Sequence, residues 1–209
     1  MKYYQELTLI DQSDVNRYHV YSYIYQELHR SLAHKKNGTD INIGISFPDY
    51  VFNAKSNKPF LGSKMRLFAK TKAELESINL RELLDTLADY VHVSSIKEVG
   101  DKATHYEVYT RYRHAGYLLK AERLQAHIIK KFGQERFDSE FANFEAVVAH
   151  CEKYNKQLGF PFINLKSASN GNPYCVRIKK EVVDKASVDT IFNGFGLSNK
   201  KYRSTVPAW

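Results

Sequence analysis

The 209-residue chain predicts an α+β protein, with a ferredoxin-like βαββαβ domain over residues 1–100 and a second α+β domain containing a basic helix over residues 101–209. Strand-like and helical patterns alternate in the first hundred residues in the ferredoxin-like order. After Gly100-Asp101 the character of the sequence changes, and a helical pattern with one strongly basic face follows. The hydrophobic content of 43% is enough to form a packed core.

The first strand and the first helix are expected before residue 40. Residues 2–10 have the composition of a strand, and Ser13 is a candidate N-cap for a helix that runs to about Lys36. Gly38 lies just beyond the end of that helix. The spacing of its apolar residues by three and four positions is typical of an amphipathic helix. These residues are Tyr21, Ile24, Tyr25, Leu28 and Leu32.

Four more elements complete the first domain. Residues 41–48 alternate apolar and polar positions as far as Pro48, which predicts a half-buried strand. Residues 64–70 predict another strand, and residues 71–90 predict a helix with its leucines toward the core. Residues 91–99 predict the closing strand. The open face of such a sheet is often used to bind RNA, although the fold alone implies no function.

The second half of the chain mixes aromatic and basic residues. Residues 105–114 predict a strand on which Arg111 and Arg113, two positions apart, project from the same side. Helices are expected at about 117–132 and 139–158. Strands are expected near residues 161–167, 174–184 and 189–195.

Charge is concentrated in the second half. The protein has 31 Lys and Arg against 23 Asp and Glu, and this formal net charge of +8 suggests a polyanionic partner. Residues 71–90 contain two basic and five acidic residues, whereas residues 111–131 contain six basic residues and one acidic residue. The second half therefore carries the electrostatic signal.

Five basic residues of the helix expected at 117–132 fall within an arc of about 100°, taking about 100° per residue. We call them the basic stripe: Lys120, Arg123, His127, Lys130 and Lys131. The opposite side, which includes Leu118 and Phe132, is expected to pack. A charge run is usually a solvated face, but the stripe lacks interleaved glutamates, so we favour a phosphate-binding surface.

Residues 160–180 form a third informative stretch. Lys166 and the bases of residues 177–180 meet no acid before Glu181, and the loop sequence SASNGN supplies two hydroxyls and two amides. Tyr174 is either a ring that stacks on a base or a strand aromatic that packs in the core. The second explanation is common in a chain with 15 tyrosines.

Several other kinds of site find no support in the sequence. The two cysteines, Cys151 and Cys175, are expected to be reduced, partly buried thiols of a cytoplasmic protein. No run is long enough for a membrane span, and no signal-peptide pattern opens the chain. No Walker or dinucleotide-binding glycine motif and no histidine pair with metal-ligand spacing occurs, so neither a cofactor nor a metal is expected.

A set of motifs spread along the chain resembles a known family. The motifs are His29 in the first helix, GISFPD at 44–49, PFINLKSASNG at 161–171, GFGLS at 194–198 and the terminal VPAW. Together they resemble the type I-F CRISPR-associated crRNA-processing endoribonucleases of the RAMP superfamily. The resemblance is strong in these motifs, weaker over residues 50–100 and weakest over residues 133–158.

The resemblance implies a metal-independent enzyme of the prokaryotic cytoplasm. Its basic helix would lie in the major groove of a CRISPR repeat stem-loop. The pre-crRNA would be cut at the 3′ base of the stem by its own 2′-OH, which leaves a 2′,3′-cyclic phosphate. The protein would stay bound to the mature crRNA as a subunit of the type I-F Cascade complex, beside the backbone subunit nearest the crRNA 3′ end.

The resemblance also assigns functional residues. The family's catalytic histidine falls on His29, and Ser167 matches the serine that positions the 2′-OH, with Ser169 as a second candidate hydroxyl. By pattern alone, a histidine at the edge of an apolar helix face is more often inert, although imidazole titrates near working pH. The expected RNA contacts are Arg111, Arg113, Lys120, Arg123, His127, Lys130, Lys131, Lys166, Ser169, Tyr174 and Phe195.

Departures from the family pattern keep other functions open. Phe195 stands where the family often has tyrosine, and phenylalanine can stack but cannot hydrogen-bond. Arg111 matches an arginine that reads a guanine near the stem base, whereas Arg113 stands where a glutamine would pair with adenine. The basic stripe is less arginine-rich than usual, and lysine lacks arginine's planar fork. The alternatives are an endoribonuclease, a non-catalytic hairpin-binding subunit of the same complex and a general RNA binder.

Overall fold

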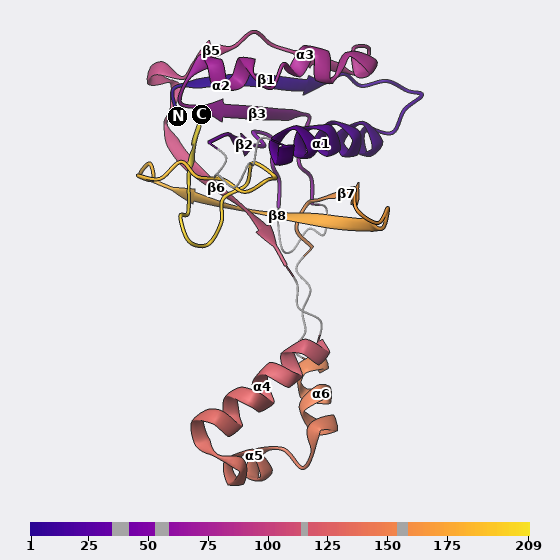
Figure 1. Cartoon of the computed structure of the whole chain (residues 1–209), viewed down its shortest axis with the longest axis vertical. Coiled ribbons are helices and arrows are strands. Elements are labelled where there is room, and N and C mark those ends of the chain that lie inside the picture. The colour runs from indigo at the N-terminus through magenta and orange to yellow at the C-terminus, as the bar shows by residue number, and fades with distance from the viewer. Residues whose placement is uncertain (35–41, 53–58, 114–116, 154–158) are drawn as a thin grey trace. The chain divides into compact units, whose positions relative to one another are not determined.

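A computed structural model describes residues 1–34, 42–52, 59–113, 117–153 and 159–209 of the chain. Within these ranges the predicted α+β class is confirmed, since helices occur together with two antiparallel sheets (Figure 1). No helix in the described ranges is both long enough and apolar enough to span a bilayer.

The first sheet is built from the N-terminal hundred residues. Its strand order is β2-β3-β1-β4, with antiparallel pairs that place Tyr4 opposite Phe68 and Leu7 opposite Val93. The predicted β-α-β-β-α-β order is present, while its assignment as ferredoxin-like stays a prediction. The elements are β1 (Tyr3–Leu9), α1 (Arg17–His34), β2 (Gly44–Ser46), β3 (Lys64–Ala69), α2 (Lys72–Glu76), β4 (Val91–Val93) and β5 (Lys97–Glu98), which also pairs with β1.

Helix α1 begins later than the sequence predicts. Its cap is Asn16 rather than Ser13, because the Asn16 side-chain oxygen accepts a hydrogen bond from the backbone N–H of Tyr18 at 2.9 Å. The predicted apolar face is confirmed: Tyr21, Ile24, Tyr25, Leu28 and Leu32 are buried. The predicted end at Lys36 and the glycine at position 38 lie outside the described residues.

The predicted helix over residues 71–90 is wrong beyond its first turns. It is divided into α2, α3 (Leu80–Leu83) and a 3₁₀ turn at Asp85–Leu87. Asn79 causes the division, because its φ of 47° is left-handed and an α-helix cannot continue through it. The strand predicted at 91–99 is likewise two short pieces, β4 and β5.

The second sheet comes from the other half of the chain. Its order is β7-β8-β6-β9, and its pairs are antiparallel, with Arg111 of β6 opposite Ile178 of β8. The strands predicted near 161–167 and 174–184 are confirmed within a residue or so. The strands are β6 (His105–Tyr112), β7 (Phe162–Lys166), β8 (Pro173–Val183) and β9 (Val206–Ala208).

The strand predicted at 189–195 is wrong, and β9 was not foreseen. Residues 189–198 form a loop whose turn needs glycine at position 196, where φ is +67° and an added Cβ would lie 2.5 Å from Ile45. The Gly196 carbonyl accepts a hydrogen bond from the Ile45 N–H at 2.8 Å. The N–H of Ser198 donates to the Tyr109 carbonyl at 2.7 Å. The loop is therefore fastened to both sheets.

The two sheets share one hydrophobic core. Phe47, Tyr109 and Val176 belong to one buried cluster, and the Tyr109 hydroxyl donates to the Phe47 carbonyl at 3.0 Å. Contacts accordingly group Met1–Tyr112 with Gly159–Trp209 as one compact unit and Arg113–Leu158 as another. The predicted domain boundary near residue 100 does not follow this grouping and stays a prediction. It was drawn from composition, which does not show which strands pack together.

The smaller unit is helical where it is described. The helix predicted at 117–132 is confirmed as α4 (Tyr117–Phe132). The helix predicted at 139–158 is instead α5 (Gln134–Glu140) followed by α6 (Phe144–Lys153), because Phe141 is extended; residues 154–158 lie outside the described ranges. The unit's own small core is Ala121, Ile128, Phe137, Phe141, Val147 and Cys151.

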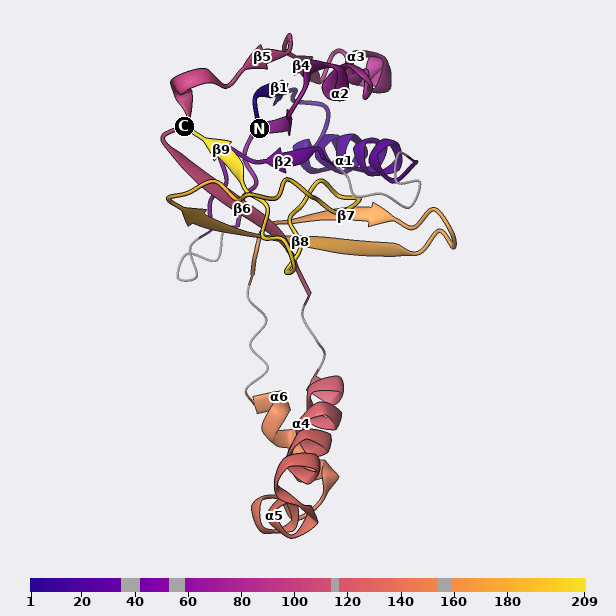
Figure 2. The same cartoon turned by 60° about the vertical axis from the view of Figure 1, so that its left-hand side comes forward.

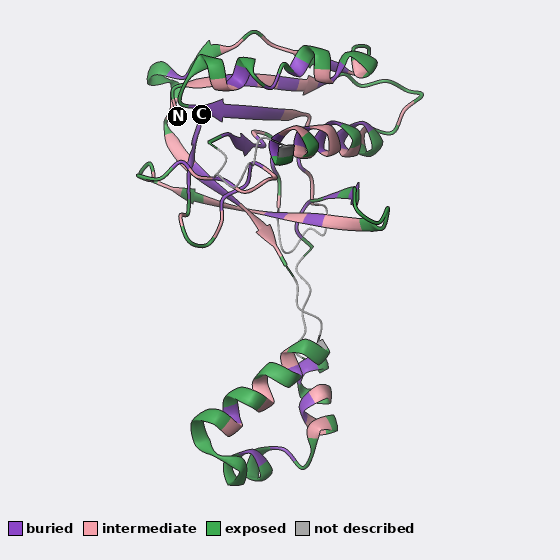
Figure 3. Ribbon diagram, viewed as in Figure 1, coloured by how far each residue is buried: buried purple, intermediate pink, exposed green. Residues whose placement is uncertain are grey.

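Only part of the predicted apolar side of α4 packs. Ala121 and Ile128 are buried, but Leu118 and Phe132 are 54% and 57% exposed. Figure 3 shows most of this unit exposed, so the apolar side of α4 is only partly covered. Cys151 is buried, Cys175 is half-buried, and both are free thiols.

Candidate functional site

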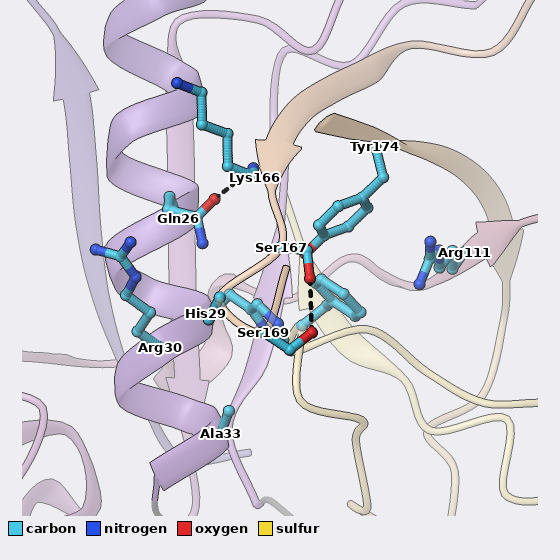
Figure 4. A pocket seen from close by; sticks show the side chains of 11 residues that line it. Gln26, His29, Arg30, Ala33, Arg111, Lys166, Ser167, Ser169 and Tyr174 are labelled. Carbon is cyan, nitrogen blue, oxygen red and sulfur yellow. Dashed lines mark hydrogen bonds between the residues drawn. The ribbon is translucent and has the colours of Figure 1, made fainter. Parts of the chain in front are cut away.

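A pocket of about 560 Å³ lies in the larger unit, and it brings together residues from four separate segments. Helix α1 contributes one wall, the turn between β7 and β8 faces it, and β6 and the 189–198 loop complete the lining (Figure 4). The lining residues are Gln26, His29, Arg30, Ala33, Arg111, Lys166, Ser167, Ala168, Ser169, Tyr174 and Phe195.

His29 is held at the edge of the apolar face of α1. Its neighbours Leu28 and Leu32 are fully buried, which fixes the rotation of the helix about its axis. His29 is half-buried and lines the pocket, as the predicted flank position requires. Its imidazole Nδ1 lies 2.6 Å from the carbonyl oxygen of Gly194. A carbonyl can only accept, so Nδ1 carries the proton and Nε2 is the nitrogen left to take one up.

Phe195 fixes the plane of the imidazole. The two rings stack with centroids 4.0 Å apart and an interplanar angle of 10°. The backbone of Phe195 is held in turn, because its carbonyl accepts a hydrogen bond from the buried Tyr25 hydroxyl at 2.9 Å. Stacking and the Gly194 carbonyl together orient His29 without a hydroxyl on the ring at position 195.

The electrostatic surroundings of His29 favour its neutral form. Burial lowers the pKa of His29 from its ordinary value of 6.5, and the nearby positive charge of Arg111 lowers the pKa further. The hydrogen bond to Gly194 raises the pKa, but burial is the larger effect and the net direction is downward. At pH 7 the imidazole is therefore mostly neutral and able to accept a proton.

Ser167 and Ser169 present two hydroxyls on the opposite wall. Their Oγ atoms lie 3.0 Å apart in the turn between β7 and β8 (Figure 4). The turn is closed by the Ser167 N–H, which donates to the Asn172 carbonyl at 2.9 Å. The N–H of Lys166 donates to the Gln26 side chain at 2.9 Å, which ties the turn to α1. The SASNGN segment is thus an organised turn that places hydroxyls near His29.

Arg111 adds a positive charge beside two aromatic rings. Its guanidinium carbon lies 5.1 Å from the centre of the Phe195 ring and 5.7 Å from that of Tyr174. Tyr174 is half-buried and packs against the core with part of its ring while also lining the pocket, so the core-packing explanation is confirmed in part and stacking on a base stays a prediction. Arg113 is exposed just beyond the end of β6 and does not line the pocket.

The basic stripe lies in the smaller unit, on α4. Arg123, His127, Lys130 and Lys131 are exposed, and Lys120 is half-buried. The first four are therefore accessible to phosphates, and their contact with RNA stays a prediction.

Residues 4–209 match the model of a family described as CRISPR-associated protein (Cas_Csy4). The chain belongs to this family. The match spans both compact units. Membership of the family supports a general role in crRNA processing and in binding of CRISPR repeat RNA.

Sequence reasoning missed some lining residues of this Cas_Csy4 protein. Gln26 and Ala33 lie three before and four after His29, so helical spacing could have found them. The Gly194 carbonyl has no such signal, because a backbone atom of a glycine leaves no side-chain pattern.

In the described residues, no group of three or more His, Cys, Asp or Glu side chains is arranged to hold a metal ion.

Replacing Phe195 with alanine is expected to slow RNA cleavage by the Cas_Csy4 protein roughly 10- to 100-fold, because a misplacement of about 1 Å in a catalytic group can cost that much. Loss of the stacked ring leaves the Gly194 hydrogen bond as the main restraint that the structure shows on the imidazole. Single-turnover cleavage of a repeat hairpin measures the effect. Phe195→Tyr is the control, since it keeps the ring, and should cleave at least as fast as the natural protein. Equal rates for Phe195→Ala and the natural protein would remove this role from Phe195.

Proposed function

We propose that this protein is a metal-independent endoribonuclease that cuts pre-crRNA at the 3′ base of the CRISPR repeat stem-loop. The observation that carries the proposal is the His29–Gly194 hydrogen bond. It leaves a neutral imidazole, with Nε2 as the proton acceptor, in a pocket that also contains Ser167 and Arg111. Membership of the Cas_Csy4 family supplies the RNA substrate class.

In the proposed reaction, Nε2 of His29 removes the proton of the substrate's 2′-OH. The 2′ oxygen attacks the adjacent phosphorus in line, and the bond from phosphorus to the 5′ oxygen breaks. The products are a 2′,3′-cyclic phosphate and a 5′-OH, whose proton comes from water or from the imidazolium. Ser167 holds the 2′-OH by hydrogen bonding, and the Arg111 charge stabilises the negative charge that develops on the phosphoryl oxygens.

The remaining assigned residues bind the RNA in this proposal. The basic stripe neutralises phosphates of the stem, Tyr174 stacks on a base and Lys166 and Ser169 contact the strand at the cut. Arg111 also reads the guanine near the stem base, and Arg113 contacts the neighbouring pair. The product stays bound, and the protein joins the other type I-F Cascade subunits in the prokaryotic cytoplasm, beside the backbone subunit nearest the crRNA 3′ end.

The test uses a repeat hairpin incubated with the protein and an excess of chelator. One hairpin has ribose at the cut site and a matched one has 2′-deoxyribose there. Chelator-resistant cleavage of the ribose hairpin alone, with a cyclic phosphate end, is the expected result. Cleavage of the deoxy hairpin would show a different nucleophile and end the proposal.

A non-catalytic hairpin-binding subunit is the second candidate function. The observation that favours it is Phe195 in the place where the family often has tyrosine. This alternative expects both hairpins to bind equally and neither to be cut. A general RNA binder expects, in addition, no preference for the cognate hairpin over an unrelated duplex.

The pH dependence of cleavage follows from the lowered pKa of His29. As a general base, His29 must be neutral, so the single-turnover rate should rise about tenfold per pH unit at acidic pH. Because the pKa lies below 6.5, the rate should reach half of its maximum below pH 6.5. A rate that instead falls as pH rises across this range would make His29 the general acid.

A further inference from the structure

A second pocket, of about 650 Å³, opens along the same seam between α1 and β7. It is lined by the first turns of α1 from Arg17 to Ser22, by residues 59–62 and by residues 161–164. The His29 pocket uses later turns of α1 and the residues that follow β7. Figure 2 shows α1 and β7 side by side, and the Lys166–Gln26 hydrogen bond joins them. The two pockets therefore follow one another along the same two elements.

Aromatic rings with cations against them characterise this second pocket. Tyr18 and Phe162 both line the pocket and are 59% and 45% exposed, so their rings are accessible to a ligand. The Arg177 guanidinium carbon lies 5.9 Å from the centre of the Phe162 ring, and that of Arg17 lies 5.4 Å from the Phe60 ring. Arg17 is held in place by Asp11, because one nitrogen of its guanidinium group donates to both carboxylate oxygens. Exposed rings beside guanidinium groups are the usual surface for unpaired bases and their phosphates.

The outer edge of β7 adds hydrogen-bonding groups. On the side of β7 that faces β8, the Pro161 carbonyl accepts a hydrogen bond from the N–H of Ile178. On the opposite side, the N–H of Lys166 donates to the Gln26 side chain on α1. Backbone groups of an antiparallel strand alternate between its two edges, so those of Phe162 and Asn164 share the α1 side with Lys166. Asn164 also lines the pocket. An amide and a strand edge can both pair with the edge of a base.

The separation of the pockets fits a short stretch of RNA. Tyr21 and His29 lie about 12 Å apart along α1, at about 1.5 Å per residue. A strand with bases stacked at about 3.4 Å covers that distance in roughly three to four nucleotides, and an extended strand needs fewer. In the proposed function, the RNA leaves the stem at the scissile phosphate as a single strand. The unpaired continuation of that strand is long enough to span the distance to the second pocket.

We propose that the second pocket binds unpaired bases of the substrate on the 3′ side of the cut, two to four nucleotides beyond the scissile phosphate. This inference rests on the proposed nuclease function. The bases stack on Phe162 and Tyr18, and the guanidinium groups accompany the backbone. The flank therefore adds to substrate affinity without taking part in the chemical step.

The experiment compares three repeat hairpins that differ in the flank beyond the cut. The first has one nucleotide there, the second has four ordinary nucleotides, and the third has four nucleotides that lack their bases. Single-turnover cleavage at increasing protein concentration gives a half-saturating concentration and a maximal rate for each RNA. The four-nucleotide flank should lower the half-saturating concentration about tenfold, as one stacked base can, with the maximal rate unchanged. The abasic flank should give no such gain. Phe162→Ala and Tyr18→Ala should lose the gain while cutting the one-nucleotide hairpin normally.

Tyr23→Ala is the matched control, since Tyr23 is 45% exposed on the same helix but does not line the pocket. A second readout needs no cleavage: 2-aminopurine at the third flank position of a 2′-deoxy hairpin should be quenched on binding, and less so with Phe162→Ala. Equal half-saturating concentrations for all three flanks, or unchanged quenching in Phe162→Ala, would overturn the proposal and leave a protein segment as the occupant. Quenching without cleavage of any hairpin would instead support the pocket and contradict the nuclease.

Discussion

Replacing His29 with alanine is expected to slow cleavage of the repeat hairpin by about 10³-fold, in the range that general acid–base groups contribute. Hairpin affinity should stay within about twofold, because His29 is half-buried and the basic stripe, which we propose as the phosphate-binding surface, is untouched. The rate is measured under single-turnover conditions with saturating protein, and the affinity with a 2′-deoxy hairpin that is not cut.

His19→Ala is the matched control, since it removes an exposed histidine from the same helix at a position outside the pocket. It should leave both the rate and the affinity unchanged. Added imidazole should restore part of the rate to His29→Ala, because the small ring can enter the space left beside Phe195. Unchanged cleavage by His29→Ala would assign the proton transfer to another group.

Local pattern predicted the elements whose burial follows a simple period. The apolar spacing of α1 placed His29 on the flank of the helix, and the structure has it there. The same reasoning failed at residues 71–90, because leucines continue the helical pattern through Asn79, where the backbone turns left-handed. Strand β9 was missed because its pairing with β6 is a contact between distant segments and has no local signal.

The candidate site shows the same division between local and distant information. Spacing alone could not bring Ser167 to His29, since a turn after β7 and a hydrogen bond to Gln26 place it there. The family motifs named both residues without their geometry. The Gly194 carbonyl, which decides the tautomer of His29, was invisible because the interaction belongs to the backbone. The family motifs named candidate residues of the pocket, and the tertiary fold determined the tautomer of His29.

Binding of the hairpin is expected to depend steeply on salt. If the stripe and its neighbours neutralise about five phosphates, log affinity should fall with log salt at a slope of about −4, so raising salt from about 50 to 200 mM weakens binding about 250-fold. The triple variant Arg123→Gln, Lys130→Gln, Lys131→Gln removes three exposed charges of the stripe. The slope should then become shallower by about three, at about one per phosphate contact.

Arg136→Gln is the control in the same compact unit, because Arg136 pairs with Glu140 on α5 rather than belonging to the stripe. It should change the slope little. A slope near zero for the natural protein, or an unchanged slope in the triple variant, would exclude the stripe as the phosphate-binding surface.

Because the pocket and the stripe are in different units, the effects of the His29 variant and of the triple variant can be measured separately. His29→Ala should change the maximal rate but not the salt slope, whereas the triple variant should change the slope but not the maximal rate. A variant set in which both quantities move together would mean that binding and chemistry are not divided between these two groups of residues.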